Sequence, residues 1–180
     1  MIPLTDPMRS LLRRFDDALT LFEYWFLALS HGLIAALVVA AVFFRYVLND
    51  PLTWTEESIV LLFTWMLFVG LANGFQARMH IRIDALLIVL PRWCWRPLGL
   101  VAVVVTGLTL LALAWFGTEQ ALIMAGTETP MMRISAAWGV SAVPAGAVLS
   151  LIHLARHLAD QGPAETLWPA DLVAAEEPSL

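Results

Sequence analysis

Residues 21–44 read LFEYWFLALSHGLIAALVVAAVFF, a nearly unbroken apolar run of 24 residues. The hydrocarbon core of a bilayer is about 30 Å thick, and a helix that rises about 1.5 Å per residue crosses it in about 20 residues. Three more runs of similar length follow, at residues 59–77, 98–118 and 134–155. The sequence therefore predicts an all-α membrane protein with four transmembrane helices. We expect a kink at Pro144 in the fourth, because proline lacks a backbone N–H.

The composition of the whole chain supports a membrane protein. Hydrophobic residues make up 60% and charged residues 14%, against about 25% charged in an ordinary soluble domain. Cys94 is the single cysteine, which rules out an internal disulfide framework, and the chain has no Cys/His spacing typical of a metal site. Basic residues are nowhere dense enough to indicate nucleic-acid binding. We therefore expect contact with membrane lipids and no nucleic acid.

The arginines predict how the spans are oriented. All ten positive charges are arginines, and eight of them fall before the first span, between spans two and three, or after the fourth; only two fall in the other two connections. Positive residues concentrate on the cytoplasmic side of spans, so both termini and the middle connection are expected in the cytoplasm of a bacterium, with the chain multi-pass in the inner membrane. A cleaved signal peptide is disfavoured, because its apolar part is typically about 7–15 residues long.

The same reading divides the chain into three parts. Residues 1–20 form a cytoplasmic N-terminal segment, residues 21–157 the four-helix membrane domain, and residues 158–180 a loosely ordered cytoplasmic tail that is rich in proline and acidic residues. Between spans two and three, an apolar run too short to cross the bilayer ends at Pro91. This run predicts a short helix that lies along the cytoplasmic interface.

The first outer connection carries two acidic residues just before span two. Thr53 and Glu56 stand three residues apart, the spacing of a capping box, and Glu57 suits the positive end of the helix dipole. Helix capping therefore explains both acids. The alternative is that Trp54, Glu56 and Glu57 form an exposed docking surface for a partner. The sequence leaves both interpretations open.

The cytoplasmic connection carries a second polar cluster, His80, Arg82 and Asp84. Its members could form a local cap or ion pair that fixes the turn after span two. They could instead contact a second membrane subunit. For each residue taken singly, the local role is slightly favoured.

Two histidines fall within or beside spans, where an ionisable side chain suggests a function. His31 and His153 raise the alternative of a haem-bearing electron-transfer subunit. The two residues differ in depth by about 10 Å, which one haem would not easily bridge. We expect instead that His31 is a satisfied polar group between helices and that His153 snorkels to the interface. Trp65, in mid-span, is expected to pack against another helix.

The chain shows no nucleophile elbow, P-loop or His-Glu-x-x-His motif. We expect no enzymatic activity, no cofactor and no metal site. Broken helices or charges at the midplane, which are typical of transporter cores, are also scarce. This favours an accessory subunit over a small independent channel or carrier.

Several short motifs occur in a specific order along the chain. They are Trp54-Thr-Glu56-Glu57, Trp65 with Gly70 five residues on, His80-Ile-Arg-Ile-Asp84-x-Leu86, Leu90-Pro91, Thr129-Pro130 and Pro144. In this order the chain resembles the small membrane subunit of tripartite ATP-independent periplasmic (TRAP) transporters, the DctQ family. The resemblance covers most of the chain but neither end.

The resemblance implies a non-catalytic subunit with four helices and both termini inside the cell. It implies two partners, a large permease subunit that carries the substrate and sodium sites, and a soluble periplasmic substrate-binding protein. The small subunit would brace the permease and help to dock the binding protein. Family transporters import organic acids such as dicarboxylates, keto acids or sialic acid by symport with sodium, and nothing in this sequence selects among them.

Overall fold

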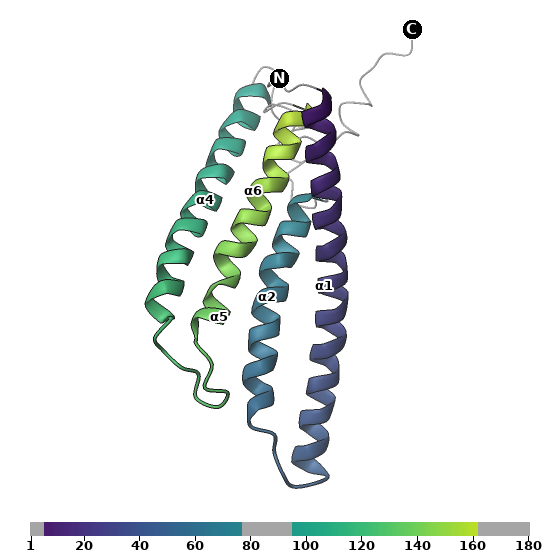
Figure 1. Ribbon diagram of the computed structural model, residues 1–180, viewed down its shortest axis with the longest axis vertical. Helices are drawn as coiled ribbons and strands as arrows, with labels where there is room; N and C mark the ends of the chain where they lie inside the picture. The colour runs from purple at the N-terminus through teal and green to yellow at the C-terminus, as the bar shows by residue number, and fades with distance from the viewer. Residues whose placement is uncertain (1–5, 77–94, 162–180) are drawn as a thin grey trace.

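The computed structural model describes residues 6–76 and 95–161 of the chain. Four of the helices in these ranges are long and apolar enough to cross a membrane, which confirms the predicted all-α fold. The helices, labelled as in Figure 1, are α1 (Asp6–Tyr46), α2 (Trp54–Gln76), α4 (Trp95–Met124), α5 (Ala137–Val140) and α6 (Ala142–Gln161). The predicted interfacial helix and residues 162–180 of the predicted C-terminal tail lie outside the described residues, whereas residues 158–161 continue α6.

The long helices lie side by side in the order α4, α6, α2, α1 (Figure 1). We call the end of the bundle formed by the connections 47–53 and 125–136 the loop end, and the opposite end, where α1 begins and α6 ends, the terminal end. A third of the fourth span is buried within the bundle, against 6% of the first. The central helix is therefore α6, and α1 and α4 are the outer ones.

The first helix is much longer than the apolar run that predicted it. Its 41 residues correspond to about 60 Å, about twice the thickness of the hydrocarbon core. Pro7 falls in the first turn, where its missing N–H has no helical partner to lose. No other proline follows before the helix ends, so the helix continues unbroken from the polar residues into the apolar run.

The expected kink at Pro144 coincides with a one-residue interruption of the helix at Ser141, whose backbone stays in the right-handed helical region. α5 ends at Val140 and α6 begins at Ala142, because Pro144 has no N–H to bond the Val140 carbonyl and its ring crowds that carbonyl. The carbonyl of Trp138 accepts two hydrogen bonds near the interruption, from the Ser141 hydroxyl at 3.0 Å and from the Trp65 indole N–H at 2.9 Å. The indole thus ties α2 to the interruption, which confirms that Trp65 packs against another helix.

Glycines let the central helix approach its neighbours closely. A Cβ added at Gly146 of α6 would lie 2.6 Å from the carbonyl oxygen of Phe68 in α2. On the other side, a Cβ at Gly117 of α4 would lie 2.9 Å from the Pro144 ring. Small residues at such contacts bring helices together in lipid, where association depends on close packing.

The Gly146 contact yields a stability prediction. Gly146→Ala forces α6 away from α2, and we expect the free energy of unfolding in detergent to fall by about 1–3 kcal/mol, as for other overpacked cores. Loss of helical circular dichroism in a denaturant titration measures it. Gly74→Ala is the matched control, because nothing lies within 4 Å of the added Cβ. Equal stability of the two variants would contradict the tight contact.

Candidate functional site

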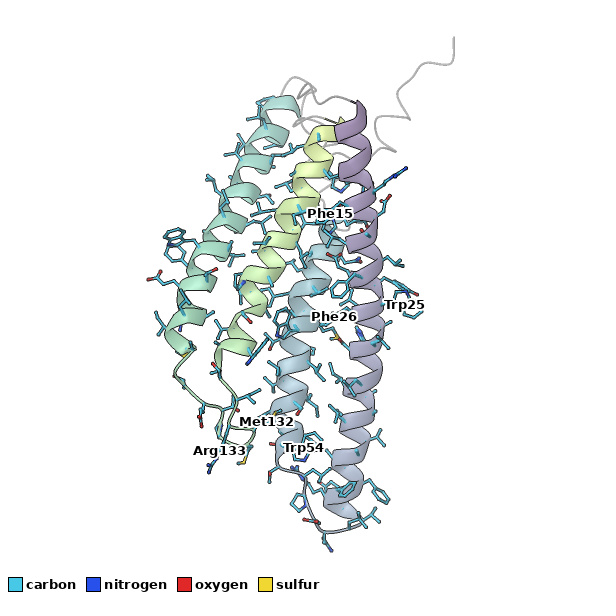
Figure 2. All side chains as sticks on the ribbon, in the orientation of Figure 1. Phe15, Trp25, Phe26, Trp54, Met132 and Arg133 are labelled. Carbon is cyan, nitrogen blue, oxygen red and sulfur yellow. The ribbon has the colours of Figure 1, made fainter. Side chains whose placement is uncertain are left out.

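The two connections at the loop end bring together residues that are distant in sequence (Figure 2). Trp54 opens α2 and is exposed. Glu56, two residues further, lies 2.5 Å from the guanidinium of Arg45 at the end of α1, and both side chains are exposed. The sequence left helix capping and partner docking both open for Glu56, and the structure records this ion pair across the α1–α2 connection. Because it is exposed, the pair contributes little stability, typically up to about 1 kcal/mol.

Glu57 turns away from that ion pair and binds the other connection. Its two carboxylate oxygens accept hydrogen bonds from the backbone N–H groups of Met131 and Met132, at 2.7 and 2.8 Å. These N–H groups belong to a tight turn, in which Thr129 donates to the Ile134 carbonyl at 2.8 Å. Two neighbouring N–H groups that point at one carboxylate form charge-assisted bonds. Glu57 therefore fixes the position of the turn against α2.

A groove of about 330 Å³ lies between α2 and the 125–136 connection. Its lining is mostly apolar, with Val60, Leu61 and Ile134 among the contributing residues, and Glu56 and Glu57 border it as well. The groove follows from the position of the turn, since Thr129, Pro130 and Met132 also line it. Neither acid was expected to form part of a groove.

A second cluster of polar residues lies inside the bundle near the terminal end. Asp16 and Glu23 of α1 meet His153 and Arg156 of α6, and we call these four residues the buried cluster. His153 Nδ1 lies 2.7 Å from Asp16 Oδ1, and its Nε2 lies 3.0 Å from Glu23 Oε1. Arg156 donates to the other oxygen of Asp16. Asp16, Glu23 and His153 are 0–1% exposed.

Helix α2 completes the surroundings of the buried cluster. The side-chain amide of Asn73 donates to the second oxygen of Glu23 at 3.4 Å. Three helices therefore contribute polar groups to one buried site, and each carboxylate has a partner at both of its oxygens. Full satisfaction of this kind is what a low-dielectric interior requires of buried charges.

The buried cluster corrects both predictions for the histidines. His153 does not snorkel, because it is fully buried between two carboxylates. His31 is exposed on the outer side of α1 rather than satisfied between helices, and its Nδ1 lies 2.8 Å from the Leu27 carbonyl of the same helix. With both nitrogens of His153 engaged, the haem alternative has no support.

Sequence reasoning missed the buried cluster, although part of its signal was visible. Asp16 and Glu23 stand seven residues apart, and His153 and Arg156 three apart, so each pair shares a helix face. What the sequence did not contain is the pairing of those two faces. The predicted inner residues His80, Arg82 and Asp84 lie outside the described residues. Within the described ranges, no group of three or more His, Cys, Asp and Glu is arranged to hold a metal ion.

The comparisons with known proteins agree with this architecture. A family model described as "Tripartite ATP-independent periplasmic transporters, DctQ component" matches residues 34–162, well over half of the chain. The chain belongs to the DctQ family. Membership confirms the resemblance drawn from the ordered motifs, and it makes the chain a multi-pass membrane component of a transporter family.

Two relatives of the DctQ family come from Vibrio cholerae serotype O1. The C4-dicarboxylate TRAP transporter small permease protein DctQ is 33% identical over 90 residues, which cover 50% of this chain and 38% of the relative. The sialic acid TRAP transporter small permease protein SiaQ is 31% identical over 104 residues, which cover 58% of this chain and 60% of the relative. The match thus spans less than two thirds of either relative.

The bonds of Glu57 yield a prediction about this DctQ family member. Glu57→Gln replaces one acceptor oxygen by an NH₂ group that faces a backbone N–H, so the turn should loosen. We expect faster amide hydrogen exchange at Met131 and Met132, with the helices unchanged. Glu56→Gln is the control, since Glu56 contacts Arg45 and not the turn. Equal acceleration in both variants would show that Glu57 does not hold the turn.

Proposed function

We propose that this chain is the small permease subunit that braces a large, many-helix permease subunit in a bacterial inner membrane, with both termini in the cytoplasm. The observation that carries the proposal is membership of the DctQ family across residues 34–162. The arginine distribution supports the orientation. The chain itself would perform no catalysis, and the permease subunit would carry the substrate and sodium sites.

The outer faces of the bundle support a bracing role. Large apolar side chains are exposed along α1, including Trp25 and Leu29, and along α4, including Leu108 and Trp115. Such faces need lipid or another membrane protein as a neighbour. Because α1 and α4 lie on opposite sides of the bundle, one face can hold the permease subunit while the other meets lipid.

The polar side chains of the buried cluster form hydrogen bonds and ion pairs with one another. In the part of the chain that the structure describes, the carboxylates of the buried cluster pair with His153 and Arg156. A carrier that works alone needs polar groups free to bind a substrate at mid-membrane. This arrangement supports an accessory subunit over an independent carrier.

The loop end supports a part in docking the periplasmic binding protein. Trp54 and Glu56 are exposed there, and Arg133 is exposed on the 125–136 connection at the same end. Glu57 holds the turn in place and so supports this surface rather than joining it. We propose that Trp54 and Glu56 touch the binding protein and that His80, Arg82 and Asp84 touch the permease subunit.

The names of the relatives, and no residue of this chain, support a substrate class. The names of the two Vibrio cholerae relatives specify a C4-dicarboxylate and sialic acid, both of which carry carboxylates. We propose that the complete transporter imports an organic acid in symport with sodium.

Co-purification tests the bracing role. The tagged full chain, expressed together with a large TRAP permease subunit from the same organism, should retain that subunit through purification in nanodiscs. The control is an unrelated four-helix membrane protein with the same tag. If the permease subunit elutes with neither protein, the proposed function is wrong.

Uptake measurements test the docking surface. The double variant Trp54→Ala, Glu56→Gln should lower uptake per transporter molecule by about tenfold or more at limiting binding protein, while its abundance stays normal. Each lost docking contact at an interface of this kind costs about 1–2 kcal/mol, and 1.4 kcal/mol is tenfold in affinity. Glu119→Gln, an exposed acid on α4, is the control. Unchanged uptake by the double variant would remove Trp54 and Glu56 from the docking surface.

A further inference from the structure

The buried cluster joins two helices that otherwise share few contacts. α1 packs mostly against α2, and its contact with α6 is much smaller. Nevertheless, Asp16 and Glu23 of α1 both reach His153 of α6. The polar contacts therefore carry most of the specificity with which α1 is placed against α6.

The geometry of His153 fixes how many protons the buried cluster holds. Each of the two nitrogen-to-oxygen contacts needs one hydrogen between the two atoms. A neutral imidazole supplies one hydrogen, so both contacts are hydrogen bonds only when one further proton lies among His153, Asp16 and Glu23. With two carboxylates, two shared protons and one ring, these three residues carry a net charge of −1, and Arg156 brings the buried cluster to zero.

The other charged groups nearby leave this balance intact. Asp17 of α1 lies 3.6 Å from Arg156, but its side chain is 68% exposed to the surroundings of the bundle. His157 of α6 is directed to the Gln76 carbonyl of α2 at 3.2 Å, and the nearest α2 side chain is the uncharged Asn73. On α4, the acidic residue within the described ranges is Glu119, near the opposite end.

We propose that Asp16, Glu23, His153 and Arg156 form a proton-retaining latch between α1 and α6, which closes when the second shared proton is bound and releases α1 when it is lost. Loss of this proton removes the hydrogen bond between His153 Nε2 and Glu23. The negative charge of the Glu23 carboxylate then has no positive charge to balance it. An uncompensated charge is costly in a buried site. Separation of α1 from α6 admits water or lipid headgroups to that carboxylate and relieves the cost.

Pulsed electron paramagnetic resonance can follow the latch in the full chain. The native Cys94 is replaced by serine, and spin labels are attached at Ala18→Cys in α1 and Ala155→Cys in α6, two positions that are exposed. In nanodiscs, the distance distribution should be single and narrow at mildly acidic pH. At alkaline pH it should broaden and shift to longer distances.

The isosteric variant Glu23→Gln decides whether a proton is responsible. Its amide supplies a permanent N–H toward His153 Nε2, so the second contact no longer needs a titratable proton and the charge balance remains zero. The distance distribution of this variant should stay narrow across the whole pH range. Glu119→Gln, the matched control on α4, should open like the parent chain.

Two outcomes would overturn the latch. One is a parent chain whose distance distribution does not change with pH. The other is a Glu23→Gln variant that opens at the same pH as the parent. Circular dichroism identifies labelled chains that fold poorly. In that case, the unlabelled parent chain and Glu23→Gln are compared by their thermal unfolding at several pH values. The unfolding temperature should vary less with pH in Glu23→Gln than in the parent chain.

Discussion

Polar groups within a bilayer can be satisfied only by other polar groups of the protein, because the hydrocarbon offers neither hydrogen bonds nor hydration. The buried cluster follows from this constraint. Two carboxylates on α1 are stable inside the bundle because His153 and Arg156 on α6 and Asn73 on α2 meet them. The interrupted fourth span obeys the same rule, since the Trp138 carbonyl near the interruption receives hydrogen bonds from Trp65 and Ser141.

Hydropathy alone predicted the four spans and the fold class, because the thickness of the bilayer imposes a length that the sequence displays directly. It underestimated α1, which continues to Asp6, since an apolar run marks where lipid begins and not where helical hydrogen bonding begins. The histidines were misplaced for a related reason. Depth along a helix can be counted from residue numbers, but the direction in which a side chain faces depends on the neighbouring helix.

The two acids before span two show how much a local pattern can conceal. Both residues fit the pattern of a helix N-terminus, so the sequence allowed the same capping role for each. In the structure, Glu56 pairs with Arg45 across one connection while Glu57 holds the turn of the other, more than seventy residues further along the chain. A capping rule considers only residues within one helical turn, so it cannot predict a contact between residues more than seventy positions apart. The result is a loop end in which one acid is exposed and its neighbour is structural.

The length of α1 has a consequence for the membrane around the protein. A helix of 41 residues cannot fit upright within a hydrocarbon layer of about 30 Å, so it must tilt or project into water. Asp16 lies ten residues from the start of that helix, close to where the lipid ends. A thinner bilayer leaves more of α1 outside the hydrocarbon, and a thicker one covers more of its length. The tilt of α1, and with it the angle at which its apolar face meets a neighbour, therefore depends on the thickness of the host membrane.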